Sequence, residues 1–162
     1  MDKERTVVLC VGNPARGDDA AGALAAPHLR ANLPEGVDLA ELGGEPADLL
    51  ERLKGAGRAY ILDACVSGGA AGGVTRFDVA SAPLPAHGFS LSSHGLGLAD
   101  ALELARALGV LPPTCVVFAI EGAAFDPGGA PTKGVTSRAR RAAELVLQEL
   151  GAGSERRESS HA

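Results

Sequence analysis

The amino-acid sequence predicts an α/β fold with three layers: a mostly parallel, twisted sheet of about five strands with helices on both faces. Short apolar and β-branched runs alternate along the chain with longer segments of helical character. The first such run, Thr6–Val11, is apolar almost throughout, which is typical of a strand buried on both faces. The chain has 162 residues, so we expect one domain over residues 1–150 and a disordered polar tail over residues 151–162.

The expected elements follow one another in a regular order. Strands are expected at Thr6–Val11, Val37–Leu42, Ala59–Asp63, Val74–Val79 and Cys115–Ile120. Helices are expected at Asp19–Leu33, Pro46–Lys54, Gly95–Gly109 and Thr136–Leu150. Pro27 predicts a kink or break in the first helix. The glycine-rich link SGGAAGG before the fourth strand is too short for a helical crossover, which favours an antiparallel or edge pairing there.

Composition and charge exclude several classes of protein. The formal net charge is −5 and no long basic run occurs, which argues against a nucleic-acid partner or an anionic membrane surface. No apolar run is long enough to cross a bilayer, and the start MDKERTVV lacks the features of a signal peptide. Cys10, Cys65 and Cys115 lie in or beside apolar runs, as buried thiols of a cytoplasmic protein do. A monomer is the default expectation.

Acids and glycines follow the predicted strands where each strand ends. Asp18 and Asp19 come after the first strand, the pair Gly43-Gly44 after the second, Asp63 at the end of the third and Glu121 after the fifth. The carboxyl ends of parallel strands meet at one edge of a sheet, and ligands of α/β proteins bind there. We therefore expect a functional site at this edge.

The turn between the first strand and the first helix is not a phosphate site. GNPARG has the glycine spacing of a phosphate-binding loop, but Asp18 and Asp19 stand where a lysine and a hydroxyl residue are needed. Two carboxylates at a helix start would repel a phosphate. A dinucleotide-binding fingerprint is absent as well, because no G-x-G-x-x-G occurs there.

The acids have a structural and a functional interpretation. Asp18 is expected to be the N-cap of the first helix and Asp19 to lie in its first turn. Asp63 closes an apolar strand, where a carboxylate is costly unless it is paired, hydrogen-bonded or bound to a cation. His94 precedes the third helix. Asp19, Asp63 and His94 together would form a site for Ni, Zn, Mn or Fe.

The motifs GNPARGDDAAG, LGGEPADLL, YILDAC and SSHGLGLADAL together resemble the hydrogenase maturation proteases. The family pattern is a strand followed by G-N-x-x-x-x-D-[DE]-x-x-G, a glycine pair after the second strand, an aspartate ending the third, and a histidine before G-L. The resemblance covers the chain from about Val7 to Glu121 and depends on the combination, since each motif alone is weak. Ala20 departs from the pattern, where glycine is frequent.

This resemblance implies an endopeptidase that removes a short C-terminal extension from the large-subunit precursor of a [NiFe] hydrogenase after nickel has been inserted. It implies that Asp19, Asp63 and His94 bind the nickel, which the substrate carries, so that the resting enzyme needs no tightly bound metal. The resemblance implies that this cleavage is the final step of hydrogenase maturation, because it lets the new C-terminus fold in and close the metal centre.

The remaining site residues have less specific roles. Asp18 could act as a general base as well as a cap. Gly43 and Gly44 would let the substrate backbone approach closely, and Glu121 would contact the substrate or a metal ligand. The sequence has no G-x-S-x-G elbow and no evident Ser-His-Asp or Cys-His set. Among the cysteines, only Cys65 follows a strand end where a thiol nucleophile could act.

Three alternative functions were weighed. A receiver domain also has an acid pair and a strand-end aspartate, but it needs a lysine after the fifth strand, and Glu121-Gly122 stands there. Peptidyl-tRNA hydrolases share the strand and G-N-P, but they need a suitably placed histidine and a basic surface. His28 lies too far along the helix for that role. A non-catalytic nickel-binding maturation chaperone on the same fold remains open.

Overall fold

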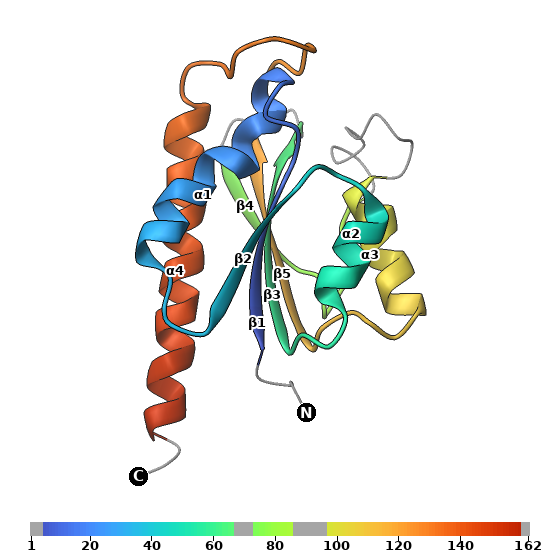
Figure 1. Cartoon of the computed structure of the whole chain (residues 1–162), viewed down its shortest axis with the longest axis vertical. Coiled ribbons are helices and arrows are strands. Elements are labelled where there is room, and N and C mark those ends of the chain that lie inside the picture. Colours follow the sequence, from blue (N-terminus) through green and yellow to red (C-terminus); the bar gives the residue numbers. More distant parts are fainter. Residues whose placement is uncertain (1–4, 67–72, 86–96, 160–162) are drawn as a thin grey trace.

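A five-stranded sheet lies between two pairs of helices in the computed structural model, which describes residues 5–66, 73–85 and 97–159 (Figure 1). The strands are β1 (Thr6–Val11), β2 (Val37–Leu42), β3 (Arg58–Cys65), β4 (Val74–Asp78) and β5 (Thr114–Glu121). The helices are the 3-10 turn η1 (Gly17–Ala20), α1 (Ala21–Asn32), α2 (Pro46–Leu53), α3 (Leu98–Ala107) and α4 (Val135–Ser159). The predicted fold class is confirmed.

The strand order is β2-β1-β3-β5-β4. β1 pairs in parallel with β2 and β3, and β3 pairs in parallel with β5. β4 runs antiparallel to β5 at the edge of the sheet, as the short glycine-rich link predicts. The ends of β1, β2, β3 and β5 therefore meet at one edge, where the functional site was expected.

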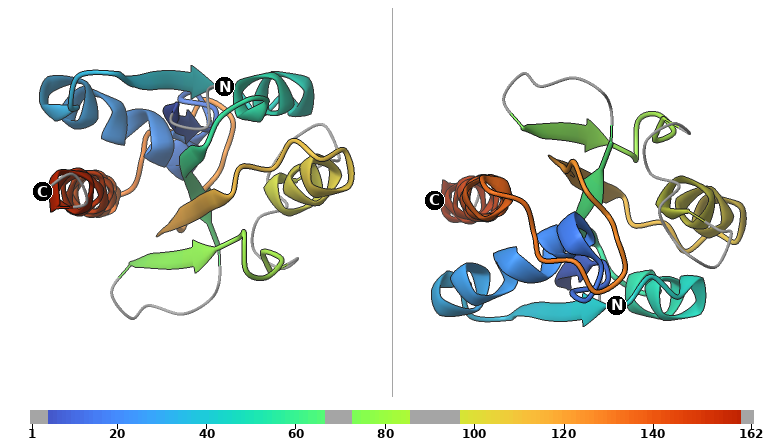
Figure 2. Two further views of the ribbon diagram at one scale, coloured as in Figure 1. Left: turned by 90° about the horizontal axis from the view of Figure 1, so that it is seen from below. Right: turned by 90° about the horizontal axis from the view of Figure 1, so that it is seen from above.

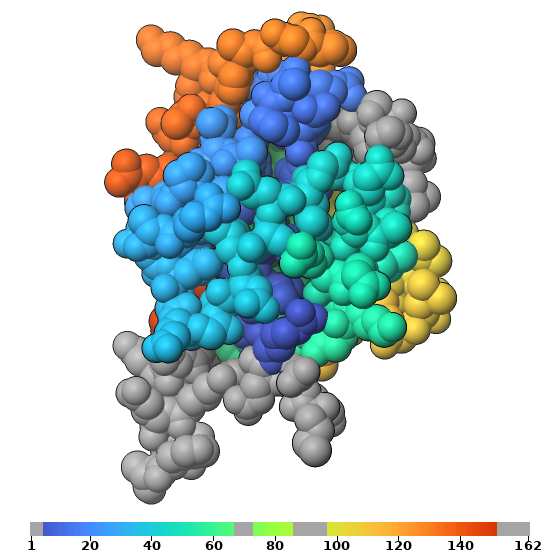
Figure 3. Space-filling model, viewed as in Figure 1, coloured from blue at the N-terminus to red at the C-terminus, as the bar shows by residue number. Residues whose placement is uncertain are grey.

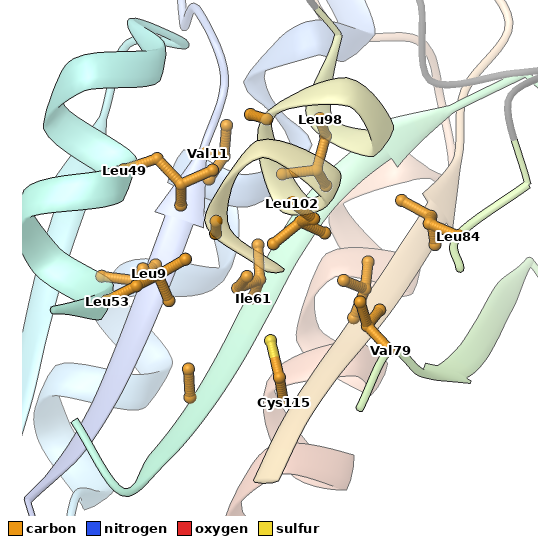
Figure 4. Packing of buried hydrophobic residues seen from close by; sticks show 14 of the residues in the cluster. Leu9, Val11, Leu49, Leu53, Ile61, Val79, Leu84, Leu98, Leu102 and Cys115 are labelled. Atoms are coloured by element: carbon orange, nitrogen blue, oxygen red, sulfur yellow. The ribbon is translucent and has the colours of Figure 1, made fainter. Parts of the chain in front are cut away.

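The core has one layer on each face of the sheet. Figure 2 shows α1 and α4 on one face and α2 and α3 on the other. On the α2 and α3 face, leucines of the helices pack onto β1, β3 and β5 (Figure 4), with Leu9, Leu49, Leu53, Ile61 and Leu102 among the buried residues. Alanines dominate the opposite face, where Ala21, Ala25, Ala26, Ala139 and Ala143 let α1 and α4 approach the sheet. Every residue of β1 is buried.

The start of the first helix differs from the prediction. Asp19–Leu33 was expected to be one helix, but Asp19 belongs to η1 and α1 begins only at Ala21. Pro27 lies inside α1, and the helix continues past it to Asn32. The change from 3-10 to α-helical geometry therefore occurs between Ala20 and Ala21, so Asp18 and Asp19 lie on the tighter 3-10 turn.

The last helix is longer than predicted. α4 runs to Ser159 and so continues beyond Leu150, through most of the segment expected to be a disordered tail. The glycines of GAGSERRES lower helix propensity, but strong helix formers follow them and the helix is already nucleated. Within the part of the chain that the structure describes, no helix is long and apolar enough to cross a membrane.

Candidate active site

The turn that follows β1 is fixed by its glycine. The Gly12 amide donates to the Leu42 carbonyl of β2 over 2.9 Å. Gly12 has a φ of 141°, and a Cβ at this position would collide with the backbone carbonyl oxygen of Asp19. Only glycine fits such a backbone and such a close approach. The turn therefore folds back against η1 and brings Asp19 to the carboxyl edge of the sheet.

Asp19 is half-buried and faces this edge. Its Oδ2 accepts a hydrogen bond of 3.0 Å from the Asn13 amide. Burial raises the pKa of the Asp19 carboxyl, while the Asn13 hydrogen bond and the positive charge of Arg16 oppose that shift. Asp19 is thus a carboxylate that is held in place but only partly stabilised.

Asp63 lies on the neighbouring strand. It is 8% exposed, and β3 continues past it to Cys65, so it is part of the strand and does not end it as predicted. Its Oδ1 accepts a hydrogen bond of 2.8 Å from the Ala64 amide. Burial raises the pKa of Asp63 well above its usual value, and the negative charge of Asp19 raises it further. The fold therefore brings together two carboxyl groups that repel each other when ionised.

Asp18, the neighbour of Asp19 in sequence, has the opposite surroundings. Its side chain is fully buried and accepts four hydrogen bonds from the loop between β5 and α4. The donors are the amides of Ala123 at 2.7 Å, Ala124 at 3.1 Å and Thr132 at 2.6 Å, and the Thr132 hydroxyl at 2.6 Å. Burial opposes ionisation, but these donors outweigh it, so the pKa of Asp18 is lowered.

The capping role expected for Asp18 is wrong. The N-cap of η1 is Arg16, and no side chain makes a capping hydrogen bond there. The Asp18 carboxylate instead binds a loop more than 100 positions away along the chain. With four donors on its two oxygens, this carboxylate has little capacity left to accept a proton from water, so its role is to hold the loop.

The turn 12–17 and the loop 122–134 are joined by their backbones as well. The Gly17 amide donates to the Gly129 carbonyl over 2.9 Å, the Asp18 amide to the Ala124 carbonyl over 2.7 Å, and the Gly128 amide to the Ala15 carbonyl over 2.7 Å. Figure 3 shows the two segments in contact at one end of the molecule, the turn in blue and the loop in orange. Together they make one firmly bonded unit beside Asp19.

Glu121 and Cys65 form a pair on adjacent strands. They face each other in the register of β3 and β5, and the Cys65 thiol donates to Glu121 Oε2 over 3.3 Å. Arg138 of α4 donates to the Glu121 backbone carbonyl over 2.9 Å. Burial, followed by the hydrogen bond to Glu121, raises the pKa of the Cys65 thiol to about 12. Cys65 is therefore protonated and is not an activated nucleophile.

Gly43 and Gly44 follow β2 at the same edge of the sheet. Gly43 is exposed, and a Cβ added to either glycine would meet no atom within 4 Å. Neither glycine is therefore needed for packing within the protein, although Gly44 has a φ of 94° that disfavours other residues.

His94 lies outside the described residues, so the geometry of the expected imidazole ligand is not part of the structure. Among the residues that are described, no group of three or more His, Cys, Asp or Glu side chains is arranged to hold a metal ion. Two of the three expected ligands, Asp19 and Asp63, lie in the described part of the chain. Two carboxylates at one edge can supply oxygen ligands to a divalent cation.

Thr132 and Arg16 were not singled out from the sequence. The bond between Thr132 and Asp18 spans 114 positions, and no local pattern signals such a partner. Arg16 stood inside the motif as a variable position, and its proximity to Asp19 follows only from the tight turn.

Comparison with known proteins gives a consistent result. A family model described as hydrogenase maturation protease matches residues 4–149. Among curated proteins, none matches the chain. Three solved structures illustrate the similarity.

The hydrogenase maturating endopeptidase HybD from E. coli is 28% identical, with a TM-score of 0.75 over 92% of this chain and 93% of that one. An endopeptidase from Escherichia coli solved in solution is 26% identical, with a TM-score of 0.77 over 92% and 93% of the two chains. A [NiFe] hydrogenase maturation protease HycI from Thermococcus kodakarensis is 26% identical, with a TM-score of 0.67 over 89% and 90%.

Proposed function

The chain belongs to the hydrogenase maturation protease family, and on this premise we propose that it removes the C-terminal extension of a nickel-loaded [NiFe] hydrogenase large-subunit precursor. The observation that carries the proposal is the meeting of Asp19 and Asp63 at the carboxyl edge of the sheet. Their charges repel each other, so a divalent cation brought between them would relieve an unfavourable interaction.

In this proposal the substrate's nickel is bound by Asp19, Asp63 and His94. Carboxylate oxygens and an imidazole nitrogen suit Ni²⁺, and three such ligands without a thiolate give a site that can release the metal with its substrate. Since nickel favours the ionised carboxylates, its binding displaces protons from the pair. The enzyme thereby distinguishes precursors that have received nickel from those that have not.

The proposed reaction is hydrolysis of one peptide bond. The oxygen of a water molecule adds to the scissile carbonyl carbon, the carbon–nitrogen bond breaks, and the amine leaves with a proton. The substrate's nickel can polarise the carbonyl or acidify the water. The cysteines support this choice over a thiol mechanism, because burial raises the thiol pKa of Cys10, Cys65 and Cys115 to about 12.

Substrate contacts are proposed on either side of the acids. Gly43 and Gly44 leave open space in which an extended peptide could approach the backbone. Glu121 lies at the end of β5 and accepts a hydrogen bond from the Cys65 thiol. It would contact the substrate or orient a ligand.

The test is the intact mass of a nickel-loaded large-subunit precursor after incubation with the protein. We expect loss of a C-terminal fragment with the wild type, no loss from nickel-free precursor, and a decrease of more than about 100-fold for Asp19→Asn, Asp63→Asn or His94→Ala. Asp38→Asn is the matched control, since Asp38 is exposed on β2, and should cleave normally.

A non-catalytic nickel-binding chaperone is the alternative function. It predicts that the wild type binds the nickel-loaded precursor and leaves its mass unchanged over many hours. That result with a cognate precursor would overturn the protease proposal and leave the binding role.

A further inference from the structure

The backbone of Arg16 is fixed from both sides. The Arg16 amide donates to the Asn13 carbonyl over 3.1 Å, and the Arg16 carbonyl accepts from the Asp19 amide over 3.0 Å. Its neighbours Ala15 and Gly17 are hydrogen-bonded to the loop 122–134. The Arg16 side chain therefore starts from a rigid position beside the acid pair.

One donor of the Arg16 guanidinium, its Nε, lacks a hydrogen-bond partner in the part of the chain that is described. This Nε is buried, and no ion pair within 4 Å joins it to a described carboxylate. A buried donor without an acceptor costs free energy, and such donors are rare in folded proteins. The residue as a whole is half-buried, so part of the side chain still faces solvent.

Arg16 lies on the same tight turn as Asp19, whose amide donates to the Arg16 carbonyl over 3.0 Å. The positive charge of Arg16 counteracts the rise in the pKa of Asp19. Asp19, Asp63 and Glu121 are acidic side chains at this edge, and Arg138, a second cation there, donates its Nε to the Glu121 backbone carbonyl. A cation in these surroundings can bind an oxygen of the substrate that the acids themselves would repel.

We propose that the guanidinium of Arg16 binds a peptide oxygen, either a carbonyl or a carboxylate, of the precursor's C-terminal segment and so holds the scissile bond near Asp19 and Asp63. This inference rests on the function proposed above. Arginine suits such a role because its planar donors can engage an oxygen acceptor from a fixed direction. The rigid turn means that little backbone order has to be gained when the substrate binds.

The test compares Arg16→Gln and Arg16→Lys with the wild type, using the nickel-loaded precursor both for equilibrium binding and for cleavage. We expect Arg16→Gln to raise Kd and KM by at least about tenfold with kcat changed by less than about twofold, and Arg16→Lys to have an intermediate effect. The melting temperature should not fall, because the buried Nε makes no hydrogen bond that the fold would lose.

Arg30→Gln is the matched control. Arg30 is an exposed arginine of α1 paired with Glu41, and its loss should leave Kd, KM and kcat unchanged. Unchanged Kd and KM in Arg16→Gln would overturn the inference, and so would a lower melting temperature that accounts for the weaker binding. With a carboxylate partner, the Kd of the wild type should rise more steeply with sodium chloride than that of Arg16→Gln, whereas with a carbonyl partner the two should respond nearly alike.

The two proposals fail in different ways. If the wild type binds the precursor without cleaving it, the protease proposal fails and the Kd of Arg16→Gln still decides the inference. If the wild type neither binds nor cleaves, both are overturned.

Discussion

Asp18 and Asp19 are adjacent in sequence, yet their carboxyl groups have opposite surroundings. Asp18 accepts four hydrogen bonds and its pKa is lowered. Burial instead raises the pKa of Asp19, and the pKa of Asp63 is raised well above its usual value. One acid therefore strengthens the fold in its ionised form, and the other two weaken it. The same substitution, aspartate to asparagine, should have opposite effects on stability at these positions.

We expect Asp18→Asn to lower the free energy of unfolding by about 3 kcal/mol at about pH 7. The NH2 group of the asparagine would face N–H donors that in the wild type donate to a carboxylate oxygen. Because the folded pKa of Asp18 is lowered, its contribution is present above the unfolded pKa of about 3.9 and is lost as the pH falls through the folded value. Urea unfolding at several pH values measures this. A difference from wild type that does not shrink below about pH 4 would contradict it.

We expect Asp63→Asn to raise the free energy of unfolding by about 1 kcal/mol at neutral pH, or the melting temperature by about 3 °C, while abolishing cleavage. The substitution removes a buried charge that Asp19 repels and keeps the acceptor for the Ala64 amide. The sign follows from the raised folded pKa: the cost of ionisation exists at pH values above it and vanishes as the pH falls to the unfolded value. A protein destabilised at neutral pH would argue against this balance of charges.

The residues of the site differ in how well their roles can be predicted from the sequence. Asp19 and Asp63 could be proposed as a pair because Asp19 comes after one strand and Asp63 lies near the carboxyl end of another, and the carboxyl ends of parallel strands share an edge. The role of Asp18 could not be predicted, because its donors come from a loop that only the folded sheet brings near. The local sequence predicts only a helix-capping role for Asp18, and in the folded protein its carboxylate binds the loop 122–134 instead.

At the scale of elements, substitution of the glycines beside the strands distinguishes a glycine needed for packing from one that could make room for the substrate. Gly22→Ala should lower the free energy of unfolding by about 2 kcal/mol, because its Cβ would meet the Val11 carbonyl oxygen of β1 and, at 2.9 Å, the Leu62 carbonyl oxygen of β3. This change pushes α1 away from the sheet. Thermal melting measures the effect, and a wild-type melting temperature would show that α1 can shift without cost.

Gly43→Ala should behave in the reverse way. Its Cβ meets nothing within 4 Å, so the melting temperature should change by less than about 2 °C. If the precursor backbone passes here, KM should rise by about tenfold or more, as a methyl group would obstruct it. Steady-state cleavage measures KM, and an unchanged KM would remove Gly43 from the substrate path. Gly44 is less suitable for this test because its φ of 94° would strain any other residue.

The elements themselves were predicted well where periodicity is strong and less well at their ends. β1 and β2 have the predicted bounds, and the antiparallel edge position of β4 follows from its short link. The tight turn η1 was merged with α1, since both have helix-type residues and their difference depends on contacts with the loop 122–134. α4 continues beyond the predicted end at Leu150, because the glycines that favour a helix stop there do not end it.

At the scale of the whole molecule, helices cover both faces of the sheet, and the described buried residues of α4 lie between Val135 and Leu150. The last residue of α4 in the described core is Leu150, and the family model also ends near it, at residue 149. Deleting residues 152–162 should therefore change the melting temperature by less than about 3 °C and leave cleavage intact. Ending the chain at Val146 is the contrasting variant, since it also removes Leu150 and the pair between Arg76 and Glu149. Equal losses in both variants would place a stabilising contact beyond residue 151.

The bonds between the turn 12–17 and the loop 122–134 have a consequence for the order of events during synthesis. The Asp18 carboxylate leaves the ribosome long before its donors, which lie 105 to 114 positions later in the chain. A nascent chain that ends after β3 already contains Asp19 and Asp63. The loop 122–134, which fixes the turn beside them, has not yet been translated at that point. The turn can make all of these bonds only after Thr132 has emerged, so we expect shorter nascent chains to lack an ordered site.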